Sequence, residues 1–147
     1  MKGEYMIRKM KESDIDTLVS LWFKASVQAH AFVDKEFWQS HMLAMKEIYL
    51  PMCDTYIYEK DRNILGFISH HQGVIPALFV SPQAQSQGVG RKLLDFMKCQ
   101  CRQLQLAVYT QNQRAHRFYL AQGFKTSGEQ ICQFTGHQEI TMTWCKM

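Results

Sequence analysis

The 147-residue chain lacks several features that would mark particular classes of protein. No apolar run approaches the roughly 20 residues that cross a bilayer, and the N-terminus lacks the basic-then-apolar layout of a secretory signal. There is no internal repeat, and no linker rich in proline, glycine or serine. We therefore expect a single domain over residues 1–147 in the cytoplasm, with no membrane attachment.

Paired metal-ligand or disulfide patterns are also missing. The five cysteines form no C-x-x-C pair, and Cys99 and Cys101 are expected on different sides of one helix. The six histidines show no spacing such as H-E-x-x-H, so no metal is expected. Free thiols fit a reducing compartment.

The charge is modest. A formal net charge of +4 is spread along the chain, and the densest basic run lies between Arg114 and Lys125. Binding to nucleic acid usually needs a larger basic stripe with exposed aromatic residues, so we expect no nucleic-acid partner. Local basicity agrees better with a ligand rich in phosphates.

The most informative motif is Gln85–Gly90, which follows the apolar run Ala77–Val80. It reads as a strand ending in a turn that opens an amphipathic helix, where unpaired N–H groups and the helix dipole bind anions. A dinucleotide fingerprint would need glycine at Leu93, and a P-loop would need Gly-Lys-Ser/Thr in place of Gly90–Lys92. The turn therefore predicts a phosphate site of another kind.

A second motif lies one predicted helix and one predicted strand downstream, at Asn112–Tyr119, and is closed by Gly123 and Phe124. The first motif, Gln85-x-x-Gly88-x-Gly90, resembles the pyrophosphate motif Gln/Arg-x-x-Gly-x-Gly/Ala of the GNAT family of acetyl-CoA-dependent N-acetyltransferases. The second resembles that family's N-x-x-A-x-x-F-Y-x-x-x-G-F at every specified position. Two motifs in this order and spacing make the chain similar to small stand-alone bacterial members over essentially its whole length.

Apolar periodicity predicts the remaining elements. A first helix follows the N-cap pair Ser13 and Asp16, and a second begins at Asp34 and stops at Pro51. The second helix is expected to bury one side, made of Phe37, His41, Ala44, Met45 and Ile48. The helix after the first motif is expected to bury Val89, Leu93, Leu94, Met97 and Cys101. Strands are expected around 5–9, 55–59, 64–71, 74–80, 106–109 and 139–144.

Together these elements predict an α/β (α+β) fold. The resemblance implies a single-domain GNAT-like architecture, in which helices flank a mixed, mostly antiparallel sheet with a central parallel pair of strands that splay apart. The connection between those two strands should be right-handed.

The resemblance also implies how acetyl-CoA, the cosubstrate, would be held. Backbone groups of Leu78–Val80 would pair with the pantetheine arm, and the amides of Gln85–Gly90 would hold the pyrophosphate with Arg91 and Lys92 as charge partners. Residues of the second motif would lie beside the coenzyme. The full set is Leu78, Phe79, Val80, Gln85, Ser86, Gln87, Gly88, Val89, Gly90, Arg91, Lys92, Asn112, Ala115, Phe118 and Tyr119. The same strand residues also read as a buried core strand, and Asn112 equally as a helix cap.

By the same resemblance Tyr119 is the general acid that protonates the departing thiolate. A phenol with a pKa near 10 and a thiol near 8.5 suit that transfer, although Phe118 and Tyr119 also read as core packing. The general base stays open among His30, Glu47, Glu59, His70 and His71. His30 and Phe32 are candidate substrate contacts, because the family commonly forms its acceptor site in that connection.

The sequence thus predicts transfer of an acetyl group to a primary amine by direct attack in a ternary complex. No cysteine is placed as a nucleophile, since Cys99 and Cys101 are expected well along a helix. The alternative is a catalytically silent module that binds or senses acyl-CoA. The acceptor stays open among protein lysines, protein N-termini, aminoglycosides, polyamines and amino acids, with a slight preference for peptide or protein amines. Both a monomer and a homodimer stay open.

Overall fold

A seven-stranded sheet in the order β1-β2-β3-β4-β5-β7-β6 forms the centre of the computed structural model, which describes residues 4–147. The strands are β1 (Tyr5–Lys9), β2 (Asp54–Lys60), β3 (Asn63–His71), β4 (Val74–Val80), β5 (Gln103–Tyr109), β6 (Lys125–Ile131) and β7 (Gln138–Cys145). All neighbouring pairs in these residues are antiparallel except β4 and β5, which are parallel. This confirms the expected mixed sheet.

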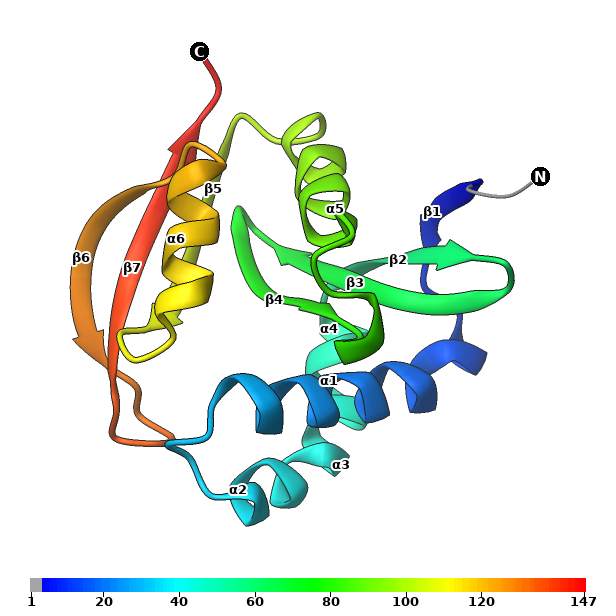
Figure 1. Cartoon of the computed structure of the whole chain (residues 1–147), viewed down its shortest axis with the longest axis horizontal. Coiled ribbons are helices and arrows are strands. Elements are labelled where there is room, and N and C mark those ends of the chain that lie inside the picture. Colours follow the sequence, from blue (N-terminus) through cyan, green and yellow to red (C-terminus); the bar gives the residue numbers. More distant parts are fainter. Residues whose placement is uncertain (1–3) are drawn as a thin grey trace.

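Helices pack against both faces of the sheet (Figure 1). They are α1 (Ile15–Ala29), α2 (Lys35–Ser40), α3 (Met42–Ala44), a π-helical turn (Met45–Tyr49), α4 (Leu50–Met52), α5 (Val89–Lys98) and α6 (Gln113–Ala121), with 3-10 turns at Glu12–Asp14 and Pro82–Ala84. Within residues 4–147 none of them is long and apolar enough to cross a membrane.

The two faces of the sheet carry two separate cores, because successive side chains in a strand point to opposite faces. In β5, Leu106 and Val108 pack with α5 and α6, whereas Tyr109 packs with the cluster that includes Trp22 and Trp38. We call the side covered by α1 to α4 the α1 face and the other side the α6 face.

The parallel pair diverges almost at once, as Figure 1 shows. Only Val74 of β4 pairs with β5, at Gln105, whereas on its other edge β4 pairs with β3 up to Val80. The later residues of β4 therefore have one edge with no β5 partner, and the predicted splay is confirmed.

The predicted cap of the first helix is wrong. Ser13 is exposed, and the chain enters α1 through a 3-10 turn in which the Lys11 N–H donates to Asp14 Oδ2 at 2.8 Å. The Arg8 guanidinium binds the same oxygen at 2.8 Å and holds the pKa of Asp14 below its usual value. A side chain from β1, six residues earlier in the chain, thus binds the capping carboxylate.

The second predicted helix is not continuous. It is interrupted at His41, between α2 and α3, and again by the π-helical turn. A π turn contains an extra residue, so it rotates the following side chains away from the regular helical spacing. Ile48, expected on the buried side, is 56% exposed, and Leu50 is 1% exposed in its place. The helical segment also continues one residue past Pro51.

Two further differences concern the second half of the chain. Helix α5 ends at Lys98, so Cys99 and Cys101 do not share a helix as predicted. Strand β6 was not predicted: nearly all its side chains are exposed, so it lacks the alternating pattern that reveals a strand.

Candidate active site

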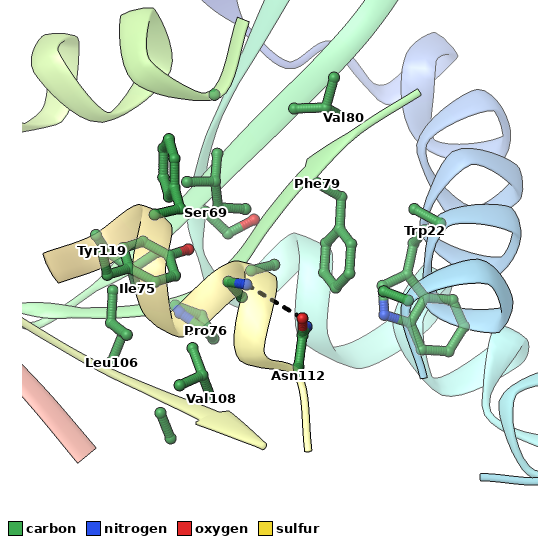
Figure 2. Close-up of a pocket in the computed structure, with 18 of the residues that line it drawn as sticks. Trp22, Ser69, Ile75, Pro76, Phe79, Val80, Leu106, Val108, Asn112 and Tyr119 are labelled. Carbon is green, nitrogen blue, oxygen red and sulfur yellow. Dashed lines mark hydrogen bonds between the residues drawn. The ribbon is translucent and has the colours of Figure 1, made fainter. Parts of the chain in front are cut away.

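A cavity of about 1230 Å³ lies where β4 and β5 diverge. Its walls come from both faces of the sheet: Leu106, Val108 and Tyr119 lie on the α6 face and Trp22 on the α1 face (Figure 2). Trp38 also lines it from the α1 face. The cavity therefore joins the two faces through the opening in the sheet. A thioester on one face and an acceptor from the other could meet there.

Most residues predicted to hold the coenzyme line this cavity. They are Leu78, Phe79, Val80, Gln85, Ser86, Gly88, Val89, Gly90, Arg91, Asn112, Ala115, Phe118 and Tyr119. Lys92 and Gln87 do not: the Lys92 ammonium lies 4.4 Å from the centroid of the Tyr5 ring, and Gln87 Nε2 donates to the Gln83 carbonyl at 3.4 Å.

The turn before α5 is an amide cradle, which we define as residues Gln85–Arg91. Its first main-chain bond within the helix runs from the Lys92 N–H to the Gly88 oxygen at 3.1 Å. The N–H groups of Val89, Gly90 and Arg91 therefore have no acceptor inside the helix. Together with the helix dipole they favour an anion such as a phosphate group.

Backbone strain shapes this cradle. Ser86 has φ of 68° and Gly88 has φ of 84°, and the left-handed region suits glycine but not serine.

We expect Ser86→Val to lower the free energy of unfolding by about 1–2 kcal/mol, since a β-branched side chain fits this conformation poorly. Urea unfolding tests this. Gln87→Val is the matched control, an exposed neighbour without positive φ, and equal losses in both variants would contradict the expectation.

Arg114 is a cation at the cradle. The sequence placed it at the start of the densest basic run but not among the residues expected to hold the coenzyme. From the first turn of α6 its guanidinium donates to Gln85 Oε1 at 3.2 Å and to Ser86 Oγ at 3.1 Å. Both partners are neutral, and within residues 4–147 no carboxylate lies in ion-pair distance of Arg114. Arg114 and Arg91, rather than Lys92, are the cationic side chains of the cavity wall.

Asn112 joins the two sides of the cavity. Its Oδ1 accepts the Ala115 N–H at 3.2 Å, the dashed bond in Figure 2, so it caps α6. Its Nδ2 lies 3.1 Å from His30 Nε2, at the end of α1. An amide nitrogen only donates, so His30 Nε2 accepts and the neutral ring carries its proton on Nδ1.

His30 lines the cavity in an environment that disfavours charge. It is 8% exposed, and its ring packs against Trp38 and Tyr109, with centroids 5.3 and 5.0 Å away. Burial lowers the pKa of His30 to about 4, so it is a weak base at neutral pH. Phe32, predicted beside it, packs edge-on with the His30 and Tyr109 rings and does not line the cavity.

Tyr119 is buried between Phe118 and Phe124, with ring centroids 5.1 and 5.5 Å away. It lies on the α6 side of the cavity with Ile75 and Leu106 (Figure 2). Burial raises the pKa of Tyr119 well above its ordinary value, so the phenol stays protonated at physiological pH. It therefore has a proton to give.

The other candidates for the general base differ in whether they line the cavity. Of them only His71 lines the cavity with His30. Glu59 is bound to Arg8 Nη2 at 2.9 Å, His70 Nε2 accepts the Gly73 N–H at 3.1 Å, and Glu47 is exposed away from the cavity.

Among the cavity residues that the sequence did not predict, a thiol and a carboxylate bear on the chemistry. Cys53, just after α4, lines the cavity, although we expected no cysteine at the reacting centre. Glu139 of β7 lines it too; in the sequence it was only the polar half of an alternating strand. Neither belongs to a motif, so the sequence alone carried no signal for them.

A splayed parallel pair with a strand–amide cradle–helix connection is the architecture of the GNAT acetyltransferases. The chain belongs to that family, because residues 23–146 match the model of the acetyltransferase (GNAT) domain.

Similar proteins cover most of the chain. Peptidyl-lysine N-acetyltransferase YiaC of Escherichia coli is 32% identical over 120 residues, which are 81% of this chain and 82% of the relative. Peptidyl-lysine N-acetyltransferase YjaB of Escherichia coli is 27% identical over 123 residues, 83% of each chain.

Solved structures share the fold. The solution structure of the apo form of YjaB from Escherichia coli superposes with a TM-score of 0.86 at 23% identity, over 96% of this chain and 97% of that one. The PaiA N-acetyltransferase from Thermoplasma acidophilum, solved in complex with coenzyme A, has a TM-score of 0.80 at 20% identity, over 97% and 99%.

Proposed function

We propose that the protein transfers the acetyl group of acetyl-CoA to the side-chain amine of a lysine in a peptide or protein, by direct attack in a ternary complex. The observation that carries this proposal is the cavity through the splayed sheet, with the amide cradle at one end and an opening on the α1 face. The names of YiaC and YjaB support lysine as the acceptor.

The coenzyme would enter from the α6 face. The free N–H groups of the cradle and the guanidinium groups of Arg91 and Arg114 would hold its diphosphate. The open edge of β4, at Leu78–Val80, offers backbone groups to the pantetheine arm, and an N–H there would stabilise the oxyanion as it forms. The structure solved with coenzyme A shares this fold and supports the choice of ligand.

The reaction needs one proton donor and no covalent intermediate. The lysine ammonium first gives one proton to water, and the neutral nitrogen then attacks the thioester carbonyl. The C–S bond breaks, and the thiolate takes the proton of Tyr119. The nitrogen loses its second proton to water, and the phenolate of Tyr119 takes a proton from water. The products are the acetylated lysine and free CoASH.

Direct attack also agrees with the state of Cys53. Burial, with a smaller effect of Asp54, raises the pKa of this thiol, so it stays protonated and a poor nucleophile at neutral pH. We expect Cys53→Ser to keep most of the acetyltransferase activity, whereas an acyl-enzyme route through Cys53 would lose nearly all of it.

The proposal is tested by calorimetry with acetyl-CoA, followed by release of free thiol in the presence of lysine peptides. We expect saturable binding, turnover that depends on the peptide, and a mass increase of one acetyl group on lysine. Absence of heat with acetyl-CoA would overturn the proposal. Tight coenzyme binding without turnover on any amine would instead support a silent acyl-CoA sensor.

A further inference from the structure

Glu139 is the only carboxylate in the cavity wall among residues 4–147. It lies in β7 directly opposite Tyr109 of β5, and residues opposite each other in an antiparallel pair share a face of the sheet. Tyr109 belongs to the cluster on the α1 face, so Glu139 is on that side too. The cations of the cavity, Arg91 and Arg114, lie in the amide cradle and α6 instead.

This carboxylate has no cation of its own. Its Oε1 accepts a hydrogen bond from Gln130 Nε2 of the neighbouring strand at 2.9 Å, and no Lys or Arg nitrogen in the described chain lies within ion-pair distance. Glu139 is also partly buried, where a charge without a partner is unfavourable. It therefore keeps free acceptor capacity that suits a cationic donor.

The sheet beside Glu139 is open to an incoming chain. On the same face of β5, Gln103, Gln105 and Ala107 are exposed, and Ala107 lines the cavity. Across the cavity from β5, Tyr49 of the π-helical turn and Met52 of α4 also line the cavity, and both side chains are exposed. A polar strand surface and an apolar wall thus flank the opening on the α1 face.

We infer that Glu139 binds the ammonium group of the acceptor lysine at this opening, by charge-assisted hydrogen bonds. The inference rests on the proposed function and adds the residue that selects a cationic amine. We assign Glu139 to recognition, because its free acceptor capacity suits a cationic donor and holding the charge of the ammonium requires no proton transfer. Loss of its charge should therefore change KM rather than kcat.

The test is Glu139→Gln, which keeps the size of the side chain and removes its charge. We expect KM for a lysine peptide to rise about tenfold, the value of one partly exposed charged contact, with kcat within about twofold. The rise should shrink at high salt, because salt screens the wild-type attraction. Glu139→Asp should recover part of the loss, and calorimetry should show unchanged acetyl-CoA binding.

Glu129→Gln is the matched control, since Glu129 lies on the adjacent strand β6, undergoes the same change of charge and does not line the cavity. It should leave KM unchanged. If the wild type acetylates the peptide but Glu139→Gln has the wild-type KM, or changes only kcat, the inference is wrong and the proposed function stands. If the wild type acetylates no amine, the proposed function fails, and the inference with it.

Discussion

Tyr119→Phe is expected to lower kcat about 10²–10⁴-fold, the usual contribution of a positioned proton donor. The change removes one hydroxyl and keeps the ring, so the packing against Phe118 and Phe124 is preserved. Binding of acetyl-CoA should change little, since the cradle and the open edge of β4 are untouched. Steady-state thiol release gives kcat, and calorimetry gives the dissociation constant.

The raised pKa of Tyr119 has two opposite effects on its role as the proton donor. Burial keeps the phenol protonated, as a proton donor must be, but it also weakens it as an acid. The transfer therefore depends on the thiolate forming next to the hydroxyl in the same apolar surroundings.

Tyr109→Phe is the control for Tyr119, because Tyr109 also lines the cavity with a pKa raised by burial. Its hydroxyl lies 3.4 Å from Cys132 Sγ and accepts from Thr135 Oγ1 at 3.5 Å. Its loss should cost kcat far less. Turnover of Tyr119→Phe within twofold of wild type, or a larger loss in Tyr109→Phe, would contradict the assignment of the acid.

The sequence predicted the parts of the fold that local chemistry dictates. The strand over Val74–Val80, the turn into α5 and the Asn112 cap depend on apolar runs, glycine and short-range capping, and all three are confirmed. The helical region 34–52 was predicted less well, because its π turn follows from packing and not from a local sequence signal.

The residues of the candidate site also fall into a group that the sequence predicted and a group that only the structure revealed. The specified motif residues carried their own signal. Arg114 lies within the second motif at a position the motif does not specify, and its contact with Gln85 spans 29 residues of sequence. Glu139 belongs to no motif and is brought beside Tyr109 by strand pairing. Residues that the fold brings together therefore had to be read from the structure.

His30 should make stability depend on pH. Its pKa is about 4 in the folded protein against an ordinary 6.5, so between these values the unfolded chain binds a proton that the folded protein does not. Stability is therefore complete above pH 6.5 and falls as the pH drops toward 4. This difference between the two pKa values corresponds to about 3 kcal/mol of unfolding free energy.

Urea unfolding of the wild type and of His30→Gln at pH 7 and pH 4.5 measures this effect. Part of the wild-type loss should be absent in His30→Gln, which cannot titrate, whereas His116→Gln, a control outside the cavity, should keep the full loss. Equal losses in the wild type and His30→Gln would show that the buried ring is not its source. The physical reason is burial, which disfavours the charged ring. In addition, a protonated Nε2 would face the Asn112 donor, so the link between α1 and the start of α6 would break. Acid should therefore loosen the cavity at the junction where the coenzyme and acceptor sides meet.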